Sequence, residues 1–328
     1  MPRPLRSLLR ALCHHRFTRQ TDAHDTLPDM TATDTSTDTT PTPEQRARRE
    51  ADRTRISGAL KHLAGKDLLI GLDVDGTLVD HDGAMTEPMR EVLQQAARDH
   101  HVVIATGRSI GATLPIVEAA GIDRGYAVCS NGAVTVQMDP GLEGGHRVIS
   151  TRVFQPGHAL ATLREVAPDA HYAVEMADGS FHATPGFQDA SFGVRATETN
   201  LDDLMVLEAV RVVVHVPDLT PQEFSKVVAE SGVHGVEYAI GWTAWLDMAA
   251  PGVSKASALE EIRERLGIDQ GSTVAVGDGF NDTEMLQWAG VGVAMGQAPQ
   301  GVKDVADTVT ASVYEDGTVL VLGSLSDA

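Results

Sequence analysis

Short apolar runs alternate with amphipathic segments in the first part of the chain. Three of these runs are predicted to be buried strands, at residues 67–73 (DLLIGLD), 101–106 (HVVIAT) and 126–130 (YAVCS). Between the first two, Thr86 is expected to cap a helix that has Pro88 in its first turn and extends to about Asp99. Between the second and third, a helix is expected to end at Gly121. Strands joined by helices in this order predict a parallel sheet.

The same alternation returns near the C-terminus. The predicted elements are a helix over 254–267 (SKASALEEIRERLG), a strand over 272–278 (STVAVGD), a helix over 281–290 (NDTEMLQWAG) and a strand over 291–295 (VGVAM). We therefore predict an α/β fold in which both parts form one doubly wound, Rossmann-like parallel sheet. This core domain is expected to span 67–133 and 251–328.

Residues 134–250 have a different pattern, with strands that follow one another closely. Predicted strands lie within 148–154, 171–184, 211–216, 236–242 and 243–249, with helices over 157–167 and 220–232. Asp178 and Gly179 are predicted to form a hairpin turn. This segment is expected to be a separate α+β cap domain, inserted into the core.

The N-terminal part is expected to lie outside the folded core. Residues 30–43 are rich in Thr, Asp and Pro, a composition typical of disorder, and 1–43 are predicted to be a disordered extension. Residues 44–66 are predicted to form a charged leading helix. The arginine-rich stretch 1–20 would suit a membrane-binding helix or a targeting peptide, but we favour an extension without function, with Met30 as the initiator.

Composition excludes some classes of function. The formal net charge is −20, from 46 acidic and 26 basic residues, which opposes binding to nucleic acid. No apolar run approaches the roughly 20 residues that span a bilayer, so no membrane partner is expected. The two cysteines are too few for a disulfide framework, which favours the reducing cytoplasm.

Polar residues follow the predicted parallel strands and begin the helix after the insert. They are Asp73 and Asp75 after the first strand, Thr106, Gly107 and Arg108 after the second, Ser130 and Asn131 after the third, Lys255 at the helix start, and Asp278, Asn281 and Asp282 after a later strand. Each motif alone is common on protein surfaces. Together, at the carboxyl ends of parallel strands, they predict one ligand site. Several acids, a hydroxyl and a lysine suit a hard cation and a phosphoryl group.

These motifs resemble the haloacid dehalogenase superfamily of phosphohydrolases. The matching stretches are DVDGTL (73–78), ATGR (105–108), SNGA (130–133), GVSKASAL (252–259), GDGFND (277–282) and AMGQAPQGVKDVAD (294–307). Within the superfamily, the chain looks most like the Cof-type (type IIB), sugar-phosphatase-like subfamily, over about residues 67–325. Only 31 residues separate Asp75 from Thr106, but 123 separate Gly132 from Lys255. The insert therefore follows the second motif, as in the large-cap branch.

The resemblance implies a role for each matching residue. Asp73 would be the nucleophile that forms an aspartyl-phosphate, and Asp75 the general acid and base. The implied phosphate-binding residues are Thr106, Gly107, Lys255 and Asn281. The implied Mg²⁺ ligands are Asp73, Asp75 through its backbone carbonyl, Asp278 and Asp282.

The expected function is therefore Mg²⁺-dependent hydrolysis of a small phosphorylated metabolite, such as a sugar phosphate. A phosphotransferase or phosphomutase of the same superfamily is an alternative, as is a non-catalytic phosphate-binding regulatory protein. Two groups of residues are candidates to contact the substrate: Arg108 and Asn131 in the core, and Glu175, His182, Arg195, Trp242 and Trp245 in the cap.

Overall fold

The computed structural model describes residues 42–187, 195–217, 219–231, 236–240 and 245–326. The predicted extension 1–43 lies almost entirely outside these residues. The first described helix is α2 (Pro43–Leu60), which is followed by the 3₁₀ turn η1 (Lys61–Leu63). Ile56 and Leu60 of α2 and Leu63 of η1 are buried in the core, so this leading helix is anchored by apolar contacts.

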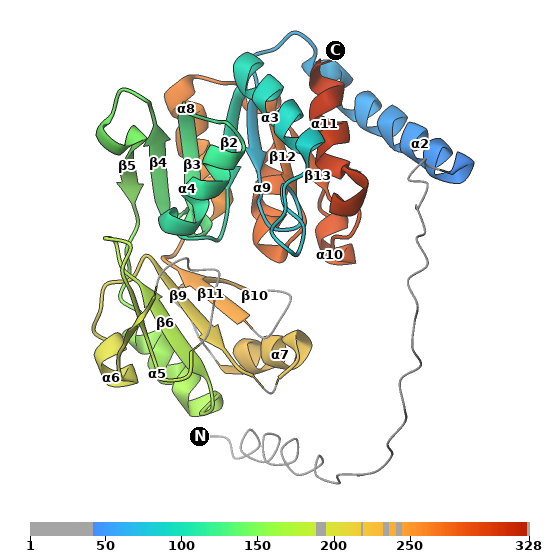
Figure 1. Cartoon of the computed structure of the whole chain (residues 1–328). Coiled ribbons are helices and arrows are strands. Elements are labelled where there is room, and N and C mark those ends of the chain that lie inside the picture. Colours follow the sequence, from blue (N-terminus) through green and yellow to red (C-terminus); the bar gives the residue numbers. More distant parts are fainter. Residues whose placement is uncertain (1–41, 188–194, 218, 232–235, 241–244, 327–328) are drawn as a thin grey trace, which may run out of the picture. The chain divides into compact units, whose positions relative to one another are not determined.

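An eight-stranded sheet organises the core, with the order β14-β13-β12-β1-β2-β3-β4-β5 (Figure 1). Its parallel strands are β1 (Leu69–Leu72), β2 (His101–Ala105), β3 (Gly125–Cys129), β12 (Thr273–Gly277), β13 (Val291–Ala294) and β14 (Thr308–Val309). β1 lies between β2 and β12, and all four of its residues are buried. A strand buried on both faces is expected to be a continuous apolar run, as LIGL is. The predicted α/β fold is confirmed.

Two antiparallel strands extend this sheet beyond β3. They are β4 (Val134–Met138) and β5 (His146–Thr151), joined by the 3₁₀ turn η3 (Glu143–Gly145). The prediction that the insert begins at residue 134 is therefore wrong, because 134–138 and 146–151 pair with the core sheet. The turn η2 (Ser130–Gly132) returns the chain beside β3, so that Val134 pairs with Cys129. A strand pattern predicts a strand, but it does not say which sheet the strand joins.

Helices cover both faces of the core sheet. The helices are α3 (Glu87–Asp99), α4 (Ile110–Ala119), α8 (Lys255–Leu266), α9 (Thr283–Trp288), α10 (Gln300–Lys303) and α11 (Gly317–Ser326), and the remaining 3₁₀ turns are η5 (Gln270–Ser272), η6 (Phe280–Asp282) and η7 (Val313–Glu315). α3 and α11 pack on the face that presents Ile70 and Leu72, whereas α8 and α9 pack on the face of Leu69. The predicted cap at Thr86 is present, since its side chain accepts from the Met89 N–H.

The inserted segment has a six-stranded sheet of its own, with the order β10-β11-β9-β6-β7-β8. Its strands are β6 (His171–Glu175), β7 (Phe181–Ala183), β8 (Thr197–Glu198), β9 (Arg211–His215), β10 (Glu237–Ile240) and β11 (Trp245–Ala249), and its helices are α5 (Gly157–Val166), α6 (Leu201–Leu204) and α7 (Pro221–Ser231). β6 and β7 form the predicted hairpin, and Gly179 has a φ of 81° in its turn. β8 and α6 were not predicted, since both are too short to show a period.

One face of this second sheet packs on its helices. Val174, Val212 and Leu246 share a buried cluster with Leu160 of α5 and Phe224 of α7. Because successive strand residues point to opposite faces, the neighbouring residues of these strands lie on the other face. Across the part of the chain that the structure describes, no helix is both long and apolar enough to cross a membrane.

Candidate active site

The carboxyl end of β1 places Asp73 beside Lys255, the first residue of α8. Lys255 Nζ lies 2.6 Å from Asp73 Oδ1 and 2.6 Å from Asp282 Oδ1. All three side chains are buried. The capping box of Ser254 and Ser257 begins α8 at Lys255, which fixes where this lysine enters the site. Residues that lie far apart in the sequence are thus brought into one buried ionic group.

Asp282 is fully engaged by its neighbours. Its Oδ1 accepts from Lys255, and its Oδ2 accepts from the backbone N–H groups of Asp278 at 2.9 Å and Gly279 at 2.8 Å. This bonding holds the loop after β12 against α8. Asp282 therefore holds Lys255 and the loop after β12 in place. Asp73 and Asp278 are better placed to offer oxygens to a ligand.

Asp73, Asp278 and Asp282 offer carboxylate oxygens that all lie within 4.8 Å of one another. Burial, followed by repulsion from Asp282, raises the pKa of Asp73 well above its ordinary value, although Lys255 opposes the shift. The same two causes raise the pKa of Asp278 to about 7. Burial lowers the pKa of Lys255, but Asp282 and Asp73 outweigh it, so the net shift is upward.

This donor set fits a divalent cation. Three buried carboxylates face one ammonium group, and like charges in a buried site repel one another unless a cation offsets them. The ligands are hard oxygens, as Mg²⁺ prefers. Gly76 makes the close approach possible, because a Cβ there would lie 2.2 Å from Asp278 Oδ2, and its φ is 77°.

Asp75 lies at the exposed side of this group. Its side chain is 59% exposed, and it accepts from Arg108 Nε at 2.9 Å and from an Arg108 terminal nitrogen at 2.5 Å. A tight turn follows, in which Leu78 and Val79 donate to the Val74 carbonyl. Arg108, predicted as a substrate contact, therefore holds the expected general acid in this structure.

The loops after β2 and β3 are linked to each other by hydrogen bonds. The N–H of Arg108 donates to Thr106 Oγ1 at 3.1 Å, and the N–H of Asn131 donates to the Thr106 carbonyl at 3.0 Å. Asn281 Nδ2 donates to Asn131 Oδ1 at 3.0 Å, which connects these loops to the loop after β12. The loops after β2, β3 and β12 are thus linked to one another, and Lys255, also predicted to bind phosphate, contacts Asp73 directly.

Gln297 belongs to the site but was not predicted. Its Nε2 donates to the Gly76 carbonyl at 2.6 Å and to Asp278 Oδ2 at 3.2 Å, while its Oε1 accepts from the Val313 N–H at 3.1 Å. It ties the turn after β1 to Asp278. Gln297 follows the end of β13, so the rule of polar residues at parallel strand ends would have found it.

The candidate substrate contacts in the insert are placed differently from one another. Glu175 is 2% exposed and both of its oxygens are bonded within the protein, so its predicted role as a substrate contact is not supported. His182 pairs with Val174 across β6 and β7, so it lies on the opposite sheet face from Glu175, and its Nδ1 lies 3.1 Å from Thr199 Oγ1. This location also does not favour substrate contact.

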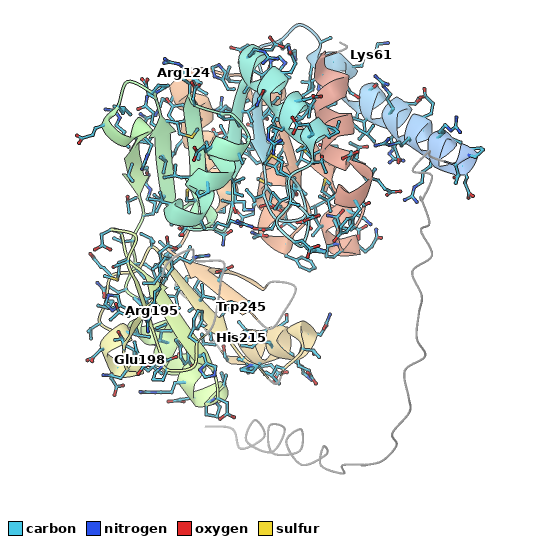
Figure 2. The ribbon with its side chains drawn as sticks, in the orientation of Figure 1. Lys61, Arg124, Arg195, Glu198, His215 and Trp245 are labelled. Carbon is cyan, nitrogen blue, oxygen red and sulfur yellow. The ribbon has the colours of Figure 1, made fainter. Side chains whose placement is uncertain are left out.

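Trp245 is the better placed of the aromatic candidates. Its ring stacks on His215 at a centroid distance of 4.8 Å and meets Phe187 edge-on at 5.6 Å, and Figure 2 shows Trp245 and His215 next to each other. Arg195 is exposed. Trp242 lies outside the described residues. A half-buried indole on the sheet face away from the helices leaves a surface for an organic group.

Comparison with known proteins identifies the family of this chain. The family model for haloacid dehalogenase-like hydrolases matches residues 70–322. The chain belongs to this family. The putative phosphatase YkrA of Bacillus subtilis (strain 168) is 30% identical over 264 residues, which cover 78% of this chain and 97% of that protein. The expected enzyme class, a phosphatase of the haloacid dehalogenase superfamily, is confirmed.

Further relatives within the haloacid dehalogenase superfamily match a similar share of the chain. The 5-amino-6-(5-phospho-D-ribitylamino)uracil phosphatase YitU of Bacillus subtilis is 25% identical over 264 residues, covering 78% of this chain and 97% of that protein. The solved structure of the phosphatase BT1666 from Bacteroides thetaiotaomicron has a TM-score of 0.63 at 26% identity, covering 80% of this chain and 96% of that one. The likeness spans both sheets.

Proposed function

We propose that this hydrolase is a Mg²⁺-dependent phosphomonoesterase that acts through an aspartyl-phosphate on Asp73. The observation that carries the proposal is the Asp73 carboxylate, buried beside Lys255 and next to the exposed Asp75. Lys255 occupies Asp73 Oδ1, so attack on phosphorus falls to Oδ2. The ammonium group opposes the upward shift in the pKa of Asp73 and would offset charge on the phosphoryl oxygens.

Asp75 would move the protons. As the ester P–O bond breaks, a protonated Asp75 would donate to the leaving oxygen. The resulting carboxylate would then take a proton from water, which attacks phosphorus and releases Asp73. Its exposure lets Asp75 reach both the leaving group and solvent, and the Arg108 pair holds it at the mouth of the site.

Asp73 and Asp278 would hold the Mg²⁺ ion, with the backbone carbonyl of Asp75, and when bound it would supply positive charge for the phosphoryl oxygens. Thr106 and the backbone at Gly107 would contact the same oxygens. Asp282 would keep Lys255 and the loop after β12 in place through the bonds described above.

The substrate proposed is a small phosphorylated metabolite, such as a sugar phosphate or a related phosphorylated polyol. The name of YitU, a phosphatase of a ribityl phosphate, supports this class for a chain that matches nearly all of that protein. The acidic overall charge opposes nucleic acid as a substrate. We place the enzyme in the cytoplasm, which accords with a buried free thiol at Cys129.

A trapping experiment tests the mechanism. The wild type is screened over sugar phosphates, nucleotides, FMN and pyridoxal phosphate, with Mg²⁺ or with chelator, and hydrolysis is expected only with Mg²⁺. Asp75→Asn is then mixed with p-nitrophenyl phosphate, whose leaving group needs no proton, and quenched in acid. Intact-mass measurement should show one added phosphoryl group, which the matched variant Asp73→Asn/Asp75→Asn should lack. An added phosphoryl group on the double variant would exclude Asp73 as the nucleophile.

A further inference from the structure

A buried ion pair in the inserted sheet contacts the core site. Glu175 ends β6 and Arg211 begins β9, and the two residues are paired across the strands. Arg211 Nε donates to Glu175 Oε2 at 2.9 Å, and the side chains are 5% and 2% exposed. The pair lies on the sheet face away from the helices. A buried ion pair is costly to desolvate, so its presence calls for a reason other than stability.

Both members of the pair bond to catalytic loops of the core. Ser130 Oγ donates to Glu175 Oε1 at 2.9 Å, and Arg211 donates through a terminal nitrogen to the Gly107 carbonyl. Gly107 lies between Thr106, which is expected to bind phosphate, and Arg108, which holds Asp75. The ion pair therefore joins the 106–108 loop to the 130–131 loop from the side of the insert.

The 130–131 loop needs such support. Ser130 and Asn131 have φ values of 51° and 54°, in the left-handed region that residues other than glycine rarely occupy. Such backbone persists when the surroundings determine it, and it is concentrated at functional sites. The Ser130 N–H donates to the Arg108 carbonyl at 2.8 Å, so a change in one loop is passed to the other.

We propose that Glu175 and Arg211 are positioning residues, which hold the two loops so that Thr106 meets the phosphoryl group and Arg108 meets Asp75. The inserted sheet then contributes to the rate of the chemistry, and not only to the choice of substrate. The proposal rests on the proposed function in one respect, that the 106–108 loop binds the phosphoryl group.

The test compares substitutions on both sides of this contact. Glu175→Ala, Arg211→Met and Ser130→Ala are each measured with p-nitrophenyl phosphate, whose leaving group needs little recognition. We expect kcat to fall by about tenfold or more, since misplacement of catalytic groups by about 1 Å costs up to about a hundredfold. Val214→Ala, on the same strand as Arg211 but facing the helices, is the matched control. It should lower the melting temperature and leave kcat within about twofold.

Two further variants separate positioning from stability. Arg211→Lys keeps a donor for the Gly107 carbonyl and should retain more activity than Arg211→Met. Glu175→Ala combined with Ser130→Ala should lose little more than either alone, because both remove the same connection. Additive losses in this pair would contradict the proposal. So would folded Glu175→Ala and Arg211→Met proteins that keep kcat within about twofold of the wild type.

A binding measurement keeps this test separate from the proposed function. The affinity for orthovanadate in the presence of Mg²⁺ reports on the phosphate loops without turnover, and it should fall in all three variants but not in Val214→Ala. A wild type that hydrolyses no ester would overturn the proposed function, while the vanadate affinities would still decide the positioning role. Should the variants in the insert fail to fold, Ser130→Ala, which lies in the core, decides it.

Discussion

At the scale of single residues, the excess of negative charge around Lys255 governs the site. Asp73 and Asp282 share one ammonium group, and Asp278 lies close to both carboxylates. The three carboxylates therefore lie close together although their negative charges repel one another. Substitutions here are expected to separate catalysis from stability, because neutralising an acid removes function while it relieves repulsion.

Asp73→Asn should abolish hydrolysis of p-nitrophenyl phosphate and leave the fold intact. The amide keeps the shape and can still accept from Lys255, but it cannot attack phosphorus. Because one like charge is removed from a buried group, the melting temperature without Mg²⁺ should stay the same or rise. Asp82→Asn, an exposed acid on the loop after β1, serves as the control and should retain full activity. A tenth of the wild-type rate in Asp73→Asn would contradict the nucleophile role.

Asp278 should make the metal-free protein less stable as the pH rises. Its pKa in the folded protein is about 7, against about 4 in an unfolded chain. Between these values the folded state binds the proton more than the unfolded state does, so the free energy of unfolding decreases from about pH 4 to about pH 7. With chelator present, the melting temperature of the wild type relative to Asp278→Asn should therefore fall across this range.

Saturating Mg²⁺ should remove this pH dependence, since the ion requires the ionised carboxylate. In activity assays, Asp278→Ala should raise the Mg²⁺ concentration for half-maximal rate far more than it lowers the melting temperature. Parallel melting curves for wild type and Asp278→Asn at every pH would show that Asp278 is ionised in the metal-free fold.

At the scale of elements, the turn after β3 and the start of α8 fit closely together. Gly132 has a φ of 103°, and a Cβ there would lie 2.1 Å from the Ser254 carbonyl oxygen. Ser254 caps the helix that carries Lys255. The turn after β3 and the start of α8 therefore approach each other at a contact that only glycine permits, and the position of Lys255 depends on it.

Gly132→Ala should accordingly lower both the melting temperature and the rate. Gly83→Ala is a matched control, because Gly83 also has a positive φ, 77°, but nothing lies within 4 Å of its added Cβ. In the control, the free energy of unfolding should fall by only about 1 kcal/mol, the cost of an alanine at a positive φ. Thermal unfolding and kcat are measured for both, and equal losses would mean that the steric contact at Ser254 is unimportant.

At the scale of the whole molecule, the two sheets divide the work unequally. Every group assigned to bond making or proton transfer follows a strand of the core sheet, and Glu175 and Arg211 support that site from the second sheet. The same face of the second sheet also carries Trp245 and His215, whose rings stack on each other. We expect it to recognise the leaving group.

Trp245→Ala should therefore change the preference among phosphorylated metabolites and spare p-nitrophenyl phosphate. The measurement is kcat/KM for the best natural substrate divided by that for the artificial ester, which should shift by about tenfold in Trp245→Ala. Asp202→Asn, an exposed site on α6, should leave the ratio unchanged. A parallel loss with both substrates in Trp245→Ala would place Trp245 in the positioning network instead.

The chain alone determined five parallel strands of the core sheet, β1, β2, β3, β12 and β13, and the residues at their ends. LIGL is apolar on both faces because β1 is central, and Asp73 follows it directly, so local pattern and chemistry coincide. Helix ends and a turn could be predicted for a similar reason, because capping and a positive φ depend on the residue itself. The residues that mark them are Thr86, Gly121, Gly179 and Gly267.

Only the tertiary structure decided which distant groups meet. The sequence did not indicate that β4 and β5 join the core sheet, that Glu175 is buried against Ser130, or that Gln297 reaches Asp278. Strand pairing and side-chain contact depend on how elements pack, and a period of two along a strand is the same in either sheet. Glu175 accordingly resembles an exposed acid in sequence, and its role follows from the Arg211 that β9 places beside it.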